Sequence, residues 1–480
     1  MRFLLFAVPT ILSLLVLWRR DRLVSRGALL GVAALYLAAA TAWWTGWDVV
    51  YLEGRLAGYF TIDSLALWFF TIMTLVFAAA AVYSLFYLRE HEVSPQREAG
   101  YVATMLLFNM AMTGVLLANH LALLWVFVEA TTLTSALLIY FERHKSSLEA
   151  AWKYIFICSI GITLAFVGII ILSIGSKSIG SLFFADLYQR AGEINPFWLK
   201  MAFAFMLVGF GTKIGVAPLH AWLPDAHSEA PSPVSALLSG ALLNSTFLGL
   251  LRFQGIMVRA QLHQFANFLF LVVGFLSLLI SAAFMLKIKN YKRMLAYSSI
   301  ENMGILFLGS ACGRTGIYAA LLHSAAHSLS KCSLFLTSGN ILHLYGSKRV
   351  EDVRGLLQRE PRTGWIWLLS FLAIAGLPPF PIFLSKFLLI MAFFEVGMGW
   401  LAAPFLLFVI VLFFGMGGAV FRMTFGIAPP PPPERGEGVH LVIAAYAPQM
   451  LLLILLLAIG INLPAKVLAL MQSAAGFYSK

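Results

Sequence analysis

The sequence predicts an all-α membrane protein that crosses the bilayer many times. Hydrophobic residues make up 61% of its 480 positions and charged residues only 11%, whereas about a quarter of the residues in a soluble domain are charged. Apolar stretches of about 20 residues, long enough to cross a ~30 Å hydrocarbon core, recur along the chain. Because lipid offers the backbone no hydrogen-bond partner, these stretches must be helices. The composition therefore excludes a water-soluble fold.

The apolar stretches predict about fourteen transmembrane helices. The first is expected to be a span and not a cleaved signal, because no small-residue cleavage site follows it and Arg19 and Arg20 do. The predicted spans cover residues 2–18, 27–46, 62–88, 101–118, 120–141, 150–174, 197–226, 231–253, 264–286, 292–312, 315–343, 364–395, 400–424 and 441–461.

The spans group into four parts. Residues 1–99 hold helices 1–3, and 100–254 form a first five-helix repeat (helices 4–8). Residues 255–428 form a second, inverted repeat (helices 9–13), and 429–480 hold a proline-rich linker and helix 14. The run from Pro429 to Pro433 cannot be helical and predicts an extended connector, which would serve as a stiff linker or as a docking contact.

The basic residues indicate an orientation in the cell membrane. The net charge of +12 could suggest nucleic acid, but Lys and Arg lie in short connections between apolar segments. We therefore expect no nucleic-acid partner. The odd-numbered connections carry about twice as many Lys and Arg as the even-numbered ones. This asymmetry places the odd connections in the cytoplasm and, with an even number of spans, both termini on the outer side.

Several predicted spans contain ionisable side chains. Each such group costs about 2.5–3.5 kcal/mol at mid-bilayer and is a functional hypothesis by default. For each residue taken alone, a purely structural role as a paired lysine or a core histidine is the alternative. A fold that needed only stability, however, would not accept the desolvation cost of so many buried charges. The candidate residues of a proton path are Glu129, Lys213, Glu301, His323, His327, Lys331 and Lys386.

Two features sharpen the hypothesis. His323, His327 and Lys331 follow at intervals of four residues and so share one face of helix 11. Helices 7 and 12 are predicted to be broken by prolines close to Lys213 and Lys386, and broken helices at membrane depth are typical of ion-transporting cores. The prolines at the predicted breaks are Pro218, Pro378, Pro379 and Pro381.

The charges also recur at a similar interval. Glu129 precedes Lys213 by 84 residues, and Glu301 precedes Lys386 by 85. An odd number of spans separates the two copies, so the second would be inverted in the membrane relative to the first. Inverted repeats with broken helices near the midplane are typical of transporters.

Two segments give the chain a family resemblance. Residues 211–236 (GTKIGVAPLHAWLPDAHSEAPSPVSA) and 326–336 (AHSLSKCSLFL) resemble helices 7 and 11 of the antiporter-like membrane subunits of respiratory complex I, of multi-subunit cation/proton antiporters and of energy-converting membrane hydrogenases. The resemblance extends over about residues 60 to 425. Residues 147–161 and 297–304 look most like the large antiporter-like subunit of hydrogenase-4 (formate hydrogenlyase) type complexes.

The resemblance implies a proton path with three parts. Glu129 and Lys213 would form one half, Lys331 and His327 a bridge, and Glu301 and Lys386 the other half. One departure concerns Asn244, which stands where complex I relatives often have a helix 8 lysine. Water or the hydroxyl of Ser245 or Thr246 would then have to carry the proton past that point.

We expect a subunit that translocates protons or Na⁺ in a redox-driven respiratory or hydrogenase complex and that does not itself supply the driving energy. The sequence has no dinucleotide fingerprint, phosphate loop, metal-ligand spacing or haem signature, so no cofactor and no catalytic site are expected on this chain. Other membrane subunits and, through them, peripheral redox subunits would be its partners. The alternatives are a subunit of a multi-subunit secondary Na⁺/H⁺ antiporter without a redox partner, and a scaffold that has lost transport.

Overall fold

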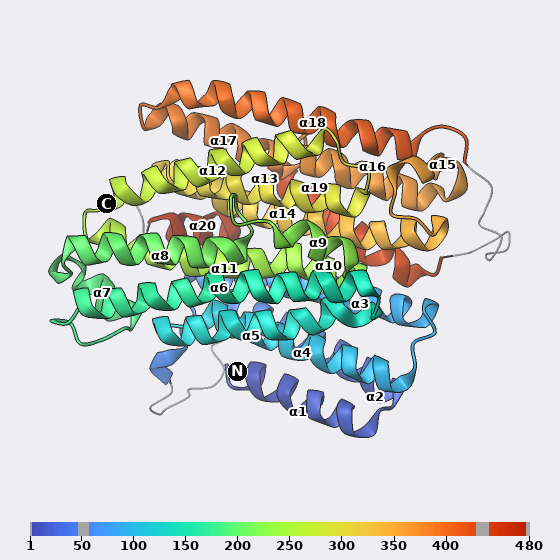
Figure 1. The fold of residues 1–480 in the computed structure, drawn as a ribbon, viewed down its shortest axis with the longest axis horizontal. Coiled ribbons are helices and arrows are strands. Elements are labelled where there is room, and N and C mark those ends of the chain that lie inside the picture. Colours follow the sequence, from blue (N-terminus) through green and yellow to red (C-terminus); the bar gives the residue numbers. More distant parts are fainter. Residues whose placement is uncertain (1, 47–56, 429–440, 477–480) are drawn as a thin grey trace.

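The computed structural model describes residues 2–46, 57–428 and 441–476, and it is a bundle of long, roughly parallel helices (Figure 1). The α-helices in chain order are α1 (Leu4–Arg19), α2 (Arg22–Trp44), α3 (Ser64–Glu90), α4 (Pro95–Leu117), α5 (Leu121–Ile139), α6 (Lys145–Gly175), α7 (Phe184–Gln189), α8 (Pro196–Ile214), α9 (Trp222–Glu229), α10 (Ser232–Leu237), α11 (Leu243–Arg259), α12 (His263–Met285), α13 (Tyr291–Ser310), α14 (Gly313–Tyr345), α15 (Leu356–Arg359), α16 (Pro361–Ala375), α17 (Pro381–Glu395), α18 (Ala402–Thr424), α19 (Ala447–Ile461) and α20 (Ala465–Gly476).

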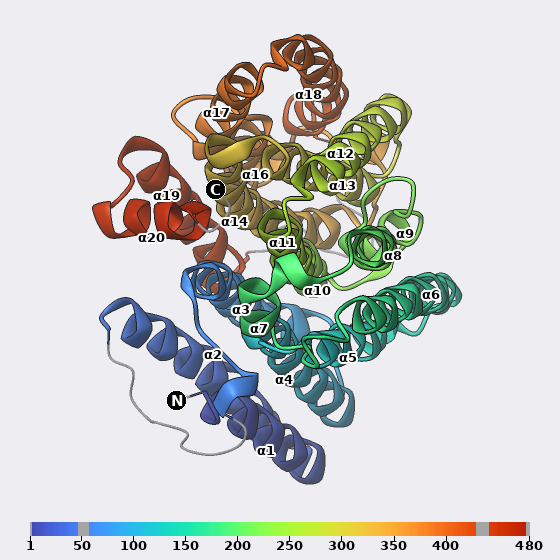
Figure 2. The same ribbon diagram turned by 90° about the vertical axis from the view of Figure 1, so that its left-hand side faces the viewer.

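Each predicted span coincides with a helix, a broken pair of helices, or the α10–α11 segment that a π turn (Leu238–Leu242) joins. Seen along the helices, α1 and α2 lie at one edge of the bundle and α18 at the opposite edge, with α10, α11 and α14 between them (Figure 2). Residues 232–258, in α10, the π turn and α11, are all buried. The middle of the bundle therefore includes α14, the helix that carries the expected bridge residues Lys331 and His327.

Fewer helices pass a strict test of length and hydropathy than the fourteen predicted spans. Among the described residues nine helices pass, or ten if the bent pair α19–α20 is counted as one span. The others fail for local reasons: α1 has 16 residues, α16 and α17 have 15 each because they are the halves of one broken span, and α13 and α14 carry many polar side chains. The chain is an all-helical, multi-pass membrane protein.

Two predicted spans are broken, as the prolines indicated. Helix α8 ends at Ile214, before a left-handed Gly215 (φ 76°), and α16 ends at Ala375, before a left-handed Gly376 (φ 88°). Pro218, Pro378 and Pro379 lie in the gaps. Pro381 does not: it is the first residue of α17, a position that suits proline because its missing N–H would be unpaired there anyway.

The C-terminal region differs from the prediction. The last predicted span began at residue 441, but α19 begins at Ala447, and it is followed by α20 at an angle of 77°. Helix α20 was not predicted; Ser473 on it lies 2.9 Å from Ser64 of α3, between the two hydroxyl oxygens. The predicted connector from Pro429 to Pro433 lies outside the described residues.

Consecutive connections alternate between the two ends of the bundle. At one end Arg26, near the start of α2, donates from its Nε to Glu98 in the first turn of α4 at 2.7 Å. At the other end the buried Arg252 binds Asp63 at 3.2 Å. The alternation is what a chain of membrane spans requires.

Candidate functional site

Lys213 lies in the last turn of α8, directly before the first helix break, and its side chain is completely buried. Its Nζ donates to Thr132 Oγ1 at 2.9 Å and to the hydroxyl of Tyr154. The ammonium also lies 4.7 Å from the centre of the Tyr154 ring. A positive charge at a helix C-terminus is stabilised by the helix dipole. The break thus provides a site for the lysine, but its direct partners are hydroxyl groups.

Glu129 does not contact Lys213. One of its carboxylate oxygens accepts a hydrogen bond from Ser159 at 3.1 Å, and the other has no partner. Among the described residues no cation lies within 4.0 Å of this carboxylate. Thr132, the partner of Lys213, follows Glu129 by three residues on α5, so the lysine contacts α5 about one turn away from the acid. Glu129 and Lys213, the acid and lysine expected to pair, therefore form no ion pair.

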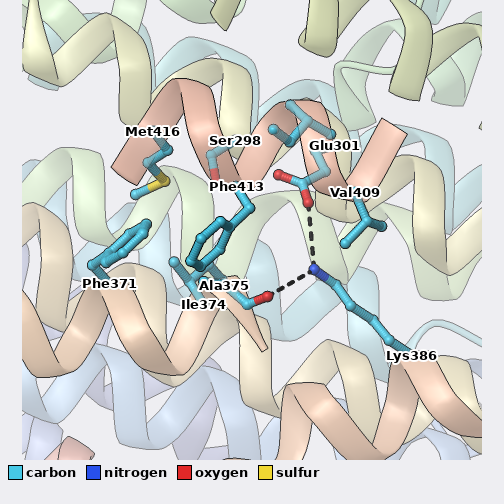
Figure 3. A pocket seen from close by; sticks show the side chains of 10 residues that line it. Ser298, Glu301, Phe371, Ile374, Ala375, Lys386, Val409, Phe413 and Met416 are labelled. Atoms are coloured by element: carbon cyan, nitrogen blue, oxygen red, sulfur yellow. Dashed lines mark hydrogen bonds and ion pairs between the residues drawn. The ribbon is translucent and has the colours of Figure 1, made fainter. Parts of the chain in front are cut away.

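Lys386 is held directly by Glu301. Its Nζ lies 3.6 Å from Oε1 of Glu301 and donates to the backbone carbonyl of Ala375 at 3.3 Å (Figure 3). Ala375 is the last residue of α16, so this carbonyl is one that the helix break leaves without an intrahelical partner. The second half therefore has the closed acid–lysine pair that the first half lacks.

A small pocket opens beside this pair. Ser298 and Glu301 from α13, Phe371 from α16 and Phe413 from α18 lie around Lys386 (Figure 3). The hydroxyl of Ser298 has no hydrogen-bond partner. The pocket has about 10 Å³ of space, which is near the minimum for one water molecule. A single water could bridge the Ser298 hydroxyl to the ion pair.

The two lysines lie on opposite sides of their breaks. Lys213 precedes Gly215, whereas Lys386 follows Gly376 and belongs to the second half of its broken helix. The similar intervals of 84 and 85 residues therefore do not give the lysines equivalent positions in the two halves.

The three residues on α14 are all completely buried, and each has a different environment. Lys331 donates to the carbonyl of Leu295 on α13 at 2.6 Å. Neither ring nitrogen of His327 has a well-formed hydrogen bond. His323 lies between Asn302 and Ser385, each 2.9 Å from one of its ring nitrogens.

His323 is thus connected to the second half. Asn302 follows Glu301 on α13, and Ser385 precedes Lys386 on α17. The ring joins the two helices that carry the ion pair. His323 thus has firmer contacts than His327.

Asn244 joins α11 to the same row. Its Nδ2 donates to Ser328 Oγ at 2.5 Å and to the carbonyl of Ser324 at 3.2 Å, both on α14. The hydroxyls of Ser245 and Thr246 instead bind carbonyls of their own helix. Of the three groups considered for this point, only the asparagine side chain reaches α14. The π turn that precedes it is a type of distortion common at functional sites.

Sequence reasoning missed His227. It lies on the short helix α9, is completely buried, and has no hydrogen bond at either ring nitrogen. Its ring stacks on Phe335 of α14 with 4.7 Å between the centres. Phe335 follows Lys331 by four residues, one turn along the same face. The sequence places His227 after the predicted break, two residues after Asp225, but the predicted span ended at residue 226 and left the histidine outside it.

A second missed feature is a pocket of about 360 Å³ at the end of the bundle where the odd connections meet; we call it the polar cup. Lys348 binds Glu229 there at 3.1 Å, and the hydroxyl of Tyr87 binds Glu142. Lys292 is almost completely buried and donates to the carbonyl of Ala230 at 2.7 Å. Eight titratable Glu, His and Lys side chains line the cup: Glu90, His91, Glu142, His144, Glu229, Lys292, His343 and Lys348.

Helix α9 and the first break are held from neighbouring helices. Asp225 binds Lys153 of α6 at 3.2 Å and also binds Arg293 of α13. In the gap before α9, the backbone N–H of Ala217 donates to Ser277 of α12 at 3.0 Å. The half-helix that carries His227 therefore has fixed contacts with both halves of the bundle.

Comparison with known proteins gives this arrangement a family. Residues 118–415 match the family model described as "NADH:quinone oxidoreductase/Mrp antiporter, TM". The chain belongs to this family. It is 35% identical over 344 residues to the hydrogenase-4 component F homolog of Methylacidiphilum infernorum, covering 69% of this chain and 72% of the relative. It is 30% identical over 338 residues to hydrogenase-4 component B of Escherichia coli, covering 68% of this chain but only 49% of the relative.

The fold matches chains in solved membrane complexes. A chain in the structure of the membrane-bound sulfane sulfur reductase, an archaeal respiratory membrane complex, superposes with a TM-score of 0.88 over 100% of this chain and 98% of that one, at 24% identity. All seven candidate path residues, and also His227 and Asn244, lie inside the family region 118–415. Helices α1–α4 and α19–α20 lie outside it.

Proposed function

We propose that this protein translocates protons across the cell membrane as an antiporter-like subunit of a redox-driven complex of the hydrogenase-4 type. The observation that carries the proposal is the buried Lys386–Glu301 pair at the α16–α17 break, with His323 held against the residues next to both of its members. Burying two charges is costly, and well-packed apolar residues would usually be as stable. A function that needs the charges accounts for them best.

The mechanism follows from how a carboxylate affects a buried lysine. An ammonium in a dry site is stabilised by a nearby carboxylate, so separating the two favours release of the proton. Lys386 is close to Glu301, whereas Lys213 has only hydroxyl partners and Glu129 stands apart. We propose that the two halves alternate between these closed and open arrangements, and that α14 carries the proton between them through Lys331, His327 and His323.

The polar cup is the proposed point of access from the cytoplasm. Lys292 lies at its buried limit, and His227 lies farther inside, beside the α14 row. Protons collected by the cup's carboxylates and histidines would pass by way of Lys292 and His227 to Lys331. This part of the proposal uses the orientation that the Lys/Arg asymmetry favours. The fourteen spans, the four-part division of the chain, the inverted five-helix repeats and the outer position of both termini belong to the same proposal.

A secondary antiporter that moves Na⁺ and H⁺ without a redox partner is the alternative function, because the family includes Mrp antiporter subunits. The two hydrogenase-4 relatives favour the redox-driven assignment. The genes beside this one provide a direct check: hydrogenase or quinone-reductase subunits support the first function, and small antiporter subunits alone support the second.

The decisive experiment measures proton uptake into membrane vesicles that contain the complete complex, driven by its own electron donor. We expect Lys213→Ala and Lys386→Ala each to abolish uptake while electron transfer continues. Uptake at the wild-type rate in both variants would refute the proposed path. Failure of both variants to assemble would support the scaffold alternative.

A further inference from the structure

The C-terminal helix α19 packs directly on the break between α16 and α17. A Cβ built on Gly460 would lie 1.9 Å from the carbonyl oxygen of Pro379 and 3.0 Å from its carbonyl carbon, the closest approach of any glycine among the described residues. The atoms in the way belong to the backbone, which cannot turn aside as a long side chain can. Only glycine lets α19 come this close to the break.

The α16–α17 break also binds Lys386, through the carbonyl of a different residue. The carbonyl of Ala375 accepts from Lys386 Nζ, and a Cβ on Gly376 would lie 3.4 Å from the Cδ of the lysine. Pro381 then begins the helix that carries Lys386. A displacement of the break would therefore move both the carbonyl that binds the ammonium and the start of α17.

Two buried residues, Leu453 and Leu456, precede Gly460 by seven and four positions and so lie on the same face of α19. This face is apolar and packed, whereas Leu457 beside it is exposed. The contact at Gly460 is thus the end of a continuous packed face, not an isolated approach.

We propose that α19 supports the α16–α17 break and that Gly460 is a positioning residue for the Glu301–Lys386 pair. The inference rests on the proposed function, and it adds a part of the chain outside the family region 118–415 to the transport machinery. A methyl group at position 460 would push the break away and change the distance between the lysine and its acid.

The test uses proton uptake by the complete complex in vesicles. Gly460→Ala is compared with Gly418→Ala on α18, where a Cβ would meet nothing within 4 Å, so the control makes the same replacement in a helix without a clash. Because a misplacement of about 1 Å can cost about 100-fold in rate, we expect Gly460→Ala to slow uptake about tenfold or more and Gly418→Ala to leave it unchanged. Wild-type uptake by Gly460→Ala would overturn the proposal.

A mutant cycle separates positioning from general packing. If Gly460 acts through the ion pair, Gly460→Ala should change uptake by less than about twofold once Glu301→Gln has already removed the pair, because coupled residues are not additive. The residual rate of Glu301→Gln is the reference, and fully additive losses would overturn the proposal.

A second pair of variants covers the case in which Gly460→Ala fails to accumulate. Leu456→Ala loosens the same face without a clash and should also slow uptake, whereas the exposed Leu457→Ala should not. Equal rates in these two would overturn the proposal. Absence of uptake by the wild type would instead refute the proposed function itself, and normal wild-type uptake with a silent Gly460→Ala would refute only this inference.

Discussion

The ring of His323 lies 2.9 Å from the hydroxyl of Ser385, the residue that precedes Lys386. Because its other nitrogen faces Asn302, beside Glu301, the ring can pass a proton only if one of these contacts is exchanged. We expect His323→Gln to lower proton uptake by about 100-fold, the lower range for loss of a proton-transferring group, since an amide does not titrate near neutral pH. Uptake is measured at matched expression.

His327→Gln is the natural comparison, because this buried ring has no well-formed hydrogen bond to lose. If both histidines carry protons, both variants slow uptake. Should only His327→Gln do so, His323 is a structural link between α13 and α17.

The ion pair of the second half should also determine stability. Removing Lys386 leaves the carboxylate of Glu301 buried without its cation, and breaking a buried pair costs about 3–5 kcal/mol. We therefore expect Lys386→Ala to lower the unfolding temperature of the purified protein in detergent. The double variant Lys386→Ala with Glu301→Gln should recover most of that stability and none of the transport.

An unfolding temperature in the double variant no higher than in Lys386→Ala would contradict this prediction. It would mean that Lys386→Ala lowers stability by removing the packing of the lysine's aliphatic chain, and not by leaving the Glu301 carboxylate without its cation.

Asp225 should affect transport more than stability. Its ion pairs with Lys153 and Arg293 lie partly exposed at the surface, where solvent and salt screen such pairs and leave them little effect on stability. They nevertheless tie α9, with His227, to α6 and α13. We expect Asp225→Asn to slow proton uptake while the unfolding temperature hardly changes.

Glu193→Gln is the matched control for Asp225. It breaks an exposed pair with Arg190 at the opposite end of the bundle, which holds no proposed path residue. Equal effects of the two variants on uptake would show that α9 does not depend on its ion pairs.

The orientation can be tested with cysteine labelling. Lys289 and Lys177 are both exposed and lie in connections at opposite ends of the bundle. A cysteine at position 289 should react with an impermeant maleimide only from the cytoplasm, and one at 177 only from outside. The native Cys158, Cys312 and Cys332 are buried and provide a low background. Labelling of both positions from one side would overturn the topology.

The sequence predicted the helices and their breaks well because both depend on local properties. Apolar length decides where a membrane helix can run, and proline next to glycine decides where it stops. The α19–α20 bend was missed although Asn462 and Pro464 lie between the two helices, because the last predicted span ended at residue 461 and no helix was predicted after it. His227 was missed because its importance depends on Phe335 and Lys331, which are remote in sequence.

The pairing of charges was harder to predict than their presence. Glu129 and Lys213 looked as close a pair as Glu301 and Lys386, since the intervals along the chain are nearly equal. Whether an acid and a lysine meet depends on the rotation of each helix about its axis and on which side of a break the lysine falls. Neither quantity is encoded in spacing across several intervening spans.

The hydrogen bond from Ala217 to Ser277 has a mechanical consequence. It joins the gap after Lys213 to α12, the helix expected to begin the second repeat. The link is a single hydrogen bond worth about 1 kcal/mol. A bond this weak can break and re-form during the proposed transport cycle. A shift of the α8–α9 break that keeps this bond would carry α12 with it, whereas a shift that breaks the bond would leave α12 in place.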